Sequence, residues 1–287
     1  MQPLKRIESF KPSGPVVLCI MDGVGIGKGD SGDMVAKAST PTLDWLKENS
    51  LYTTLKAHGL AVGMPSDGDM GNSEVGHNAI GSGRVFDQGA LLVKNAVESG
   101  AVFEGDVWQD LTNGLTADNT LHFMGLLSDG NVHSHVDILF ALIRRAKEQN
   151  IKKVRVHTLL DGRDVGPTSA LEYVAALEEL LTEINGSGDF DYCIASGGGR
   201  LYITMDRYDA DWPMVERGWN THVHGIGRTF ATATEAVETL RSEDPGVIDQ
   251  DLKEFVIERD GNPVGPMTDG DSVILFNFRG DLSLIHI

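Results

Sequence analysis

The stretch KVRVHTLLDGRDVGPTSALEYVAALEELLTEI, residues 153–184, carries the pattern that decides the fold class. KVRVHTLL predicts a strand, DGRDVGPTS a loop and ALEYVAALEELLTEI an amphipathic helix. A strand, a loop and a helix in this order form the repeating unit of α/β proteins, in which the loops gather at the strand ends and build the sites. The stretch therefore predicts an α/β sheet with functional residues in its loops.

The same order recurs on both sides of this stretch. LHFMGLL, residues 121–127, precedes the loop SDGNVHSH and a helix expected near residues 136–148. DYCIAS, residues 191–196, precedes GGGR, and VILFNF, residues 273–278, predicts one more buried strand. Nearer the N-terminus, the apolar run VVLCIMD, residues 16–22, indicates a buried parallel strand that ends in the glycine-rich loop DGVGIGKG.

Composition limits the classes of function. The net charge of −18 argues against bulk attraction to nucleic acid or to an anionic membrane, but not against small anionic substrates. No apolar run approaches the ~20 residues that cross a bilayer. The two cysteines, Cys19 and Cys193, lie in apolar runs without metal-ligand spacing, which favours reduced thiols in the core. We expect a soluble, cytoplasmic protein.

The stretch DMGNSEVGHNAIGSGR, residues 69–84, surrounds Ser73 with glycines. If a helix begins at EVGHNAIG, its N-terminus faces the Ser73 hydroxyl and suits an attached phosphate. Serine becomes a nucleophile only when a base or a metal activates it. The alternative is a serine N-cap in a tight turn. Asp22 also has two interpretations, a ligand of a hard cation or an acceptor in an Asp-Gly turn.

The predicted loops carry further polar residues. Asp129, His133 and His135 could ligate a metal, hold an acid–base or phosphate-binding histidine, or be solvated loop residues. Arg163, between two aspartates, could pair with a carboxylate or bind an anionic substrate, with Asp164 as a proton carrier. Four arginines in or beside such loops suggest one pocket for phosphate and carboxylate groups: Arg163, Arg200, Arg207 and Arg279.

Together these motifs resemble the 2,3-bisphosphoglycerate-independent phosphoglycerate mutases, members of the alkaline phosphatase superfamily. The resemblance rests on MDGVGIG, MGNSEVGHNAIGSGR, SDGNVHSH, DGRDVGP, GGGRLYITMDRYDADW and FNFRGD, and it spans residues 14–281. The long GGGRLYITMDRY motif is similar to the trypanosomatid and plant-like branch. The resemblance implies a monomer that interconverts 3-phosphoglycerate and 2-phosphoglycerate in glycolysis and gluconeogenesis, without 2,3-bisphosphoglycerate.

The resemblance also implies roles for the candidate residues. Ser73 would carry the phosphoryl group during turnover, and Asp22 and Ser73 would help to hold two Mn²⁺ ions, or Co²⁺ or Mg²⁺ in their place. Asp164 would move protons to and from the glycerate hydroxyls. The substrate would be held by His133, Arg163, Arg200, Arg207 and Arg279.

The implied fold is an alkaline-phosphatase-like domain interrupted by an inserted α/β transferase domain. Residues 1–88 would be the N-terminal part of the phosphatase-like domain, and residues 89–287 an incomplete transferase domain. Family members are much longer, and Leu282 stands where they have a second arginine, so the resemblance implies a C-terminally truncated chain that is inactive alone. The alternatives are a metal-dependent phosphohydrolase or phosphopentomutase of the same superfamily, or a phosphosugar-binding fragment without catalysis.

Overall fold

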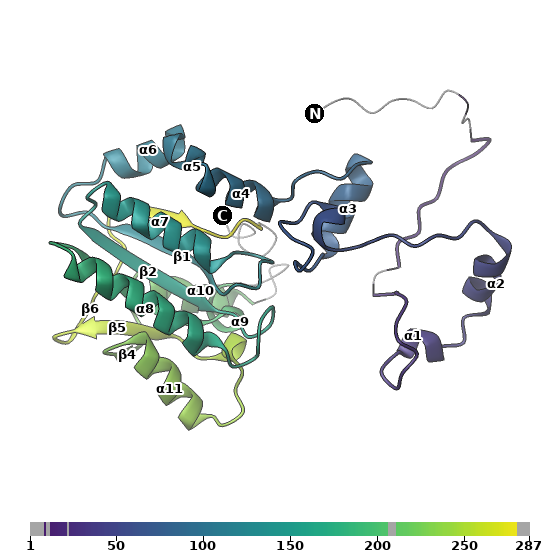
Figure 1. The fold of residues 1–287 in the computed structure, drawn as a ribbon. Helices are drawn as coiled ribbons and strands as arrows, with labels where there is room; N and C mark the ends of the chain where they lie inside the picture. Colours follow the sequence, from purple (N-terminus) through teal and green to yellow (C-terminus); the bar gives the residue numbers. More distant parts are fainter. Residues whose placement is uncertain (1–8, 10–11, 22, 206–210, 280–287) are drawn as a thin grey trace.

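The computed structural model describes residue 9 and residues 12–21, 23–205 and 211–279 (Figure 1). Within these ranges a seven-stranded sheet has the order β4-β5-β3-β2-β1-β7, with β6 paired to β5. The strands are β1 Leu121–Leu127, β2 Lys153–Leu160, β3 Asp191–Gly199, β4 Arg228–Phe230, β5 Phe255–Arg259, β6 Asn262–Pro263 and β7 Ser272–Leu275.

Three of the predicted strands, β1, β2 and β3, form the centre of this sheet, whereas β7, predicted as residues 273–278, ends at Leu275 and is the last strand of the described order. β1 pairs in parallel with β2 over the whole length of β1, from Leu121 opposite Val154 to Leu127 opposite Leu160. β3 pairs in parallel with β2, and β7 in parallel with β1. Parallel pairing places the loops that follow β1, β2, β3 and β7 at one edge of the sheet. The α/β prediction is confirmed, and this edge is where the candidate residues meet.

Helices cover both faces of the sheet (Figure 1). α7 Val136–Glu148, α8 Ala170–Gly186 and α11 Ala233–Glu243 bury apolar side chains against one face, such as Leu139 and Leu177. α9 Arg200–Ile203 and α10 Trp212–His222 lie behind the sheet in this view. None of the helices in the described ranges is long and apolar enough to cross a membrane. The remaining helices of this part are α4 Gly89–Glu98, α5 Ala101–Glu104, α6 Asp106–Asn113 and η2 Asp249–Asp251.

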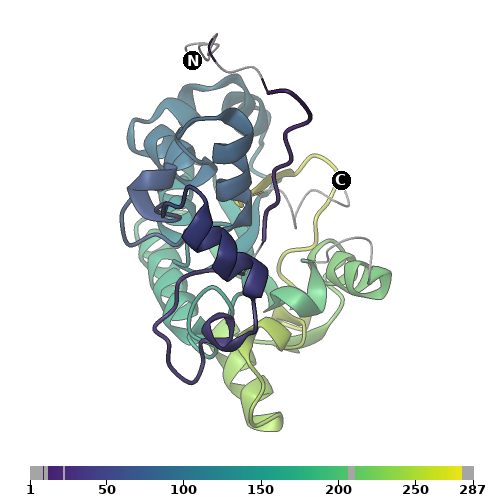
Figure 2. The same cartoon turned by 90° about the vertical axis from the view of Figure 1, so that its right-hand side faces the viewer.

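The N-terminal region differs from its prediction. It contains α1 Met34–Lys37, α2 Pro41–Asn49, η1 Gly59–Val62 and α3 Ser73–Ser82. Figure 1 shows α1 and α2 apart from the sheet, and in Figure 2 they lie in front of the rest of the molecule. Residues 16–21 form no strand, and Val17 is 84% exposed. The predicted buried strand is therefore wrong here, because a strand is buried only when neighbouring strands pair with it. For the same reason Cys19 is an exposed free thiol, whereas Cys193 is half-buried.

Candidate functional site

Ser73 is the first residue of α3. Asn72, not Ser73, is the N-cap, and its side chain accepts a hydrogen bond from the Val75 amide, so the serine N-cap interpretation is wrong. His77 Nδ1 lies 2.7 Å from the Ser73 carbonyl oxygen and 3.4 Å from Ser73 Oγ. The shorter contact requires Nδ1–H as the donor. His77 in this tautomer is no base for the hydroxyl, which lies at the positive end of the helix.

The glycines around Ser73 have separate structural reasons. A Cβ on Gly71 would lie 1.9 Å from the Ala57 carbonyl oxygen, so only glycine fits there. Gly83 has a φ of 64° and ends α3 in the left-handed region. A Cβ on Gly76 or on Gly81 would find open space within 4 Å, so no close contact requires glycine at these two positions. Glycine therefore brings the Ser73 loop close to residue 57 and ends the helix.

A pocket of about 320 Å³ lies between this loop and the edge of the sheet. The loops after β1, β2, β3 and β7 all contribute to it, because the parallel strands end side by side. The pocket is lined by Met70, Gly71, Asn72, Val132, His133, Arg163, Asp164, Arg200, Leu201, Met205 and Arg279. Three of the four predicted arginines thus surround one pocket, next to the residues that precede Ser73.

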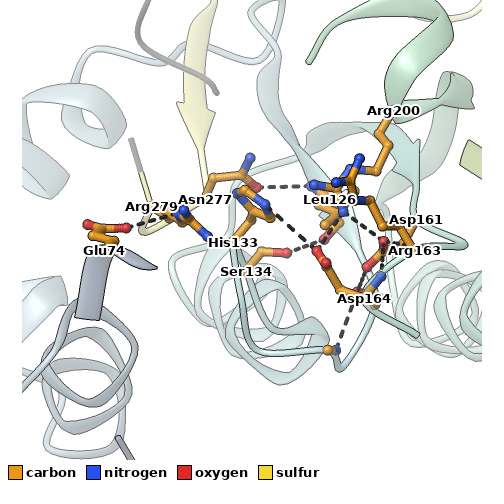
Figure 3. Close-up of polar contacts among 12 residues, drawn as sticks. Glu74, Leu126, His133, Ser134, Asp161, Arg163, Asp164, Arg200, Asn277 and Arg279 are labelled. Carbon is orange, nitrogen blue, oxygen red and sulfur yellow. Dashed lines mark hydrogen bonds and ion pairs between the residues drawn. The ribbon is translucent and has the colours of Figure 1, made fainter. Parts of the chain in front are cut away.

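Two aspartates from the loop after β2 hold Arg200 (Figure 3). Its Nη1 donates to Asp161 Oδ1 at 2.8 Å and to Asp164 Oδ2 at 2.6 Å. The side chains of Arg200 and Asp161 are almost completely buried, and Ser128 Oγ donates to the second oxygen of Asp161. The carboxylate pair expected around Arg163 therefore forms, but with Arg200. Arg163 is exposed, and its guanidinium makes no hydrogen bond within the described ranges.

His133 lies beside this group, whereas His135 and Asp129, the other two candidate residues of its loop, bond to other residues. His133 Nε2 is 3.7 Å from Asp164 Oδ2, beyond hydrogen-bonding distance. The side chain of His135 accepts from the Asp137 amide as the N-cap of α7. Asp129 accepts from the Tyr173 hydroxyl, and burial, together with Asp129, raises the pKa of Tyr173 to about 12. Among the described residues the structure contains no cluster of three or more His, Cys, Asp or Glu side chains that could hold a metal, so the metal interpretation of this loop is wrong.

Arg279 connects the pocket to α3. Its Nε lies 2.9 Å from Glu74 Oε2 in the first turn of that helix (Figure 3). The backbone amide of Phe278 donates to the His133 carbonyl oxygen at 2.8 Å, which fixes the segment after β7 beside the histidine loop. Asn131 Nδ2 donates to Asp69 Oδ1 and ties the same loop to the Ser73 region. Nothing in the sequence pattern indicates the contacts of Glu74 and Asn131, because they join segments far apart in the chain.

The structure leaves three sequence predictions without a position. Asp22, the predicted metal ligand, and Arg207, the fourth arginine, lie outside the described residues. Leu282 and the segment that follows it also lie outside. Of the site residues predicted from the sequence, the pocket therefore contains His133, Asp164 and three arginines.

We expect Arg200→Met to lower the free energy of unfolding by about 3–5 kcal/mol, because the change leaves the buried carboxylate of Asp161 without its cationic partner. Urea unfolding followed by circular dichroism measures the loss. The matched control is Arg228→Met, whose ion pair with Glu243 is exposed and should contribute far less. An Arg200→Met protein as stable as the control variant would contradict the assigned role of this ion pair.

The comparison with known protein families gives one match at this site. The family model described as BPG-independent PGAM N-terminus (iPGM_N) matches residues 93–284, which include every described arginine of the pocket. The match thus covers the loops after β1, β2, β3 and β7, but not Ser73.

Curated relatives match more of the chain. A probable 2,3-bisphosphoglycerate-independent phosphoglycerate mutase of Leptospira interrogans is 54% identical over 277 residues, which are 95% of this chain and 50% of the relative. The 2,3-bisphosphoglycerate-independent phosphoglycerate mutase of Trypanosoma brucei brucei is 48% identical over 94% of this chain and 49% of the relative. The chain therefore spans about half the length of the curated relatives it matches.

A solved structure matches the fold as well. The structure of Leishmania mexicana phosphoglycerate mutase at low cobalt concentration has a TM-score of 0.86 and 47% sequence identity to this chain. The match covers 92% of this chain and 48% of that protein. The fold is therefore similar to that of about half of a solved mutase.

Proposed function

This chain belongs to the family of 2,3-bisphosphoglycerate-independent phosphoglycerate mutases, and from that premise we propose that its pocket binds phosphoglycerate. The observation that carries the proposal is the set of three arginines, from the loops after β2, β3 and β7, around one pocket of about 320 Å³. A substrate with a phosphate and a carboxylate needs several fixed cationic donors, and arginine binds both groups in a bidentate manner. In a protein as long as the relatives, the reaction would interconvert 3-phosphoglycerate and 2-phosphoglycerate in glycolysis and gluconeogenesis.

The arginines of the pocket have different parts in this proposal. Arg163 is exposed and offers its guanidinium to the substrate, whereas Arg200 is already held by two carboxylates and fixes the wall of the pocket. Arg279 is shared with Glu74, so it links bound substrate to the helix of Ser73. His133 completes the described binding residues. Arg207 stays in the proposal through the family resemblance alone.

We assign the phosphoryl transfer to Ser73. Its Oγ would form a bond to phosphorus while the bond from phosphorus to the C3 oxygen of the glycerate breaks. The glycerate oxygen gains a proton as the serine hydroxyl loses one, and Asp164, in the same pocket, would carry protons for the glycerate hydroxyls. Return of the phosphoryl group to the C2 oxygen would complete the isomerisation and restore Ser73.

The described residues do not by themselves complete a site for the two divalent ions that the family resemblance implies. They contain no cluster of three metal-ligating side chains, and Glu74, beside Ser73, is paired with Arg279. A divalent ion needs several oxygen or nitrogen ligands at short distance. We therefore derive no step through a metal. Asp22 and Ser73 remain proposed ligands of Mn²⁺ or a similar ion, and this chain is proposed to be inactive alone.

The proposal includes a division of the chain and a setting for the protein. Residues 1–88 would belong to the phosphatase-like domain and residues 89–287 to the transferase domain. The family resemblance supports a monomer in the cytoplasm that acts on small phosphoglycerates without 2,3-bisphosphoglycerate. For this chain by itself, phosphoglycerate binding without catalysis is the capacity that the pocket supports.

Isothermal titration calorimetry, which measures the binding of 3-phosphoglycerate to the 287-residue chain, tests the proposal. We expect saturable binding without turnover in a coupled enolase assay, and about tenfold or more weaker binding by Arg163→Met, which removes charge-assisted contacts. Arg144→Met, an exposed arginine on α7 outside the pocket, is the matched control and should bind like the unchanged chain. Absence of binding, or equal loss in both variants, would overturn the proposal.

A further inference from the structure

A row of six polar side chains, four of them buried and two half-buried, crosses the face of the sheet that is opposite α7 and α8. Its members come from three adjacent strands and from the segments around them. The facing side-chain nitrogen or oxygen atoms of neighbouring members are 3.3 Å apart or less. The phosphoglycerate pocket contains none of them. We call this group the histidine chain: Asp271, His122, His157, Ser196, His222 and Thr204.

The carboxylate of Asp271 sets the direction of the first hydrogen bonds. Its oxygens accept from the Thr120 and Thr268 amides, and although burial opposes this effect, these bonds lower the pKa of Asp271. Asp271 Oδ2 lies 3.3 Å from His122 Nε2, so Nε2–H must donate to it. Burial lowers the pKa of His122, and the neutral ring then has a bare Nδ1. That nitrogen accepts from His157 Nε2–H at 2.9 Å.

The hydrogen-bond donors and acceptors can be assigned in the same way from His157 to Thr204. Burial, followed by neighbouring cationic groups, holds the pKa of His157 well below its usual range, so its Nδ1 accepts from the Ser196 hydroxyl at 2.7 Å. Ser196 Oγ then accepts from His222 Nδ1–H at 2.8 Å. The bare Nε2 of His222 lies 3.2 Å from Thr204 Oγ1, which must donate to it. One carboxylate thus fixes the tautomer of three histidines.

Two members of the histidine chain, Ser196 and Thr204, flank Arg200 in the sequence. Ser196 belongs to β3, the strand that leads into α9, and Thr204 follows the last residue of α9. Arg200 begins α9, and its carbonyl oxygen accepts from the amides of Thr204 and Met205. α10, which carries His222, packs tightly on this helix, because a Cβ on Gly218 would lie 1.8 Å from the Ile203 carbonyl oxygen. The segment that carries Arg200 is therefore held before and after the arginine.

We propose that the histidine chain positions the Arg200 wall of the phosphoglycerate pocket, with Ser196, His222 and Thr204 as positioning residues. The expected effect of the histidine chain on phosphoglycerate binding rests on the proposed function. The direction of the hydrogen bonds, from Thr204 toward Asp271, does not depend on that function. Loss of one member allows the histidines between it and Thr204 to adopt the other tautomer. The segment of α9 then loses a fixed contact.

Nuclear magnetic resonance of the ¹⁵N-labelled protein tests the direction of the hydrogen bonds in the histidine chain. We expect Nε2–H tautomers for His122 and His157 and an Nδ1–H tautomer for His222. In Ser196→Ala, His222 should show both tautomers while His122 keeps its own. An Nε2–H tautomer of His222 in the unchanged chain, or an unchanged His222 in Ser196→Ala, would overturn the proposal.

The effect on the pocket is measured in Ser196→Ala and in Thr204→Val. Ser196→Ala and Thr204→Val should each shift the Arg200 Nε–H resonance and weaken 3-phosphoglycerate binding by about threefold to tenfold. The matched control is Thr221→Val, which removes a buried hydroxyl of α10 that donates only to the Arg217 carbonyl oxygen. If the unchanged chain binds no 3-phosphoglycerate, the proposed function fails, but the Arg200 resonance still decides this inference. An Arg200 resonance that moves equally in the control, or in none of the variants, would refute it.

Discussion

Replacement of Ser73 by alanine is expected to abolish phosphoglycerate interconversion in a chimera that joins residues 1–279 to the second half of the Leptospira interrogans relative. Ser73 presents its hydroxyl at the N-terminus of α3, next to the pocket residues Gly71 and Asn72. Alanine leaves no atom to accept the phosphoryl group, so we expect a loss on the order of 10⁴-fold or more in turnover. Binding of 3-phosphoglycerate should stay close to that of the unchanged chimera, because the arginines are untouched.

The control for this prediction is Ser82→Ala on the same helix. Ser82 lies at the opposite end of α3, where its hydroxyl donates to carbonyl oxygens of its own segment. The unchanged chimera must first show activity in the coupled enolase assay. Mass spectrometry after rapid quenching should then find phosphoserine at residue 73 in the unchanged and Ser82→Ala proteins. Substantial turnover by Ser73→Ala would show that another group carries the phosphoryl group.

Mild acid is expected to destabilise the 287-residue chain strongly, because three histidines are buried in the neutral form. Burial lowers the pKa of His122, His157 and His222 from 6.5, that of His222 to about 4. The unfolded chain therefore binds more protons than the folded chain below pH 6.5, and stability falls with falling pH. His222 contributes up to about 1.4 kcal/mol per pH unit between pH 6.5 and 5, and His122 and His157 act in the same direction. The contribution is complete above pH 6.5 and, for His222, is lost progressively down to about pH 4.

Urea unfolding at several pH values between 7.5 and 5 measures this loss. Carboxylates whose pKa is lowered, such as Asp271, titrate from about 3.8 downward and act mainly below the window. His222→Gln keeps a polar side chain but cannot gain a proton, so it should reduce the slope by about 1.4 kcal/mol per pH unit. Thr221→Val leaves every histidine in place and should keep the slope. A free energy of unfolding that is constant from pH 6.5 to 5 would refute the prediction.

The sequence predicted the central strands and the helices between them. β1 and β2 have the predicted bounds, and α7 has the expected range of residues 136–148. These elements are predictable because side-chain periodicity and apolar runs are local properties of the chain. The arginine pocket was predictable for a related reason, since loops that follow parallel strands lie at one edge of a sheet.

The sequence alone was wrong where pairing with distant residues decides the outcome. Residues 16–21 have the composition of a buried strand, yet no described strand pairs with them and they are exposed. Arg163 lies between two aspartates in sequence, but the residue that binds Asp161 and Asp164 is Arg200. The carboxyl ends of β2 and β3 are neighbours in the sheet, which places Arg200 within reach.

Motifs and local periodicity were sufficient to identify the family, the α/β class and the loops that carry the site. Which arginine is buried, which residue caps α3 and how the histidine chain is ordered depend on contacts that form only in the folded protein. His122 and His157 are 35 residues apart in sequence and 2.9 Å apart between their ring nitrogens. The register of β1 and β2 and the packing of α10 create such contacts, and these depend on the whole fold rather than on any one segment.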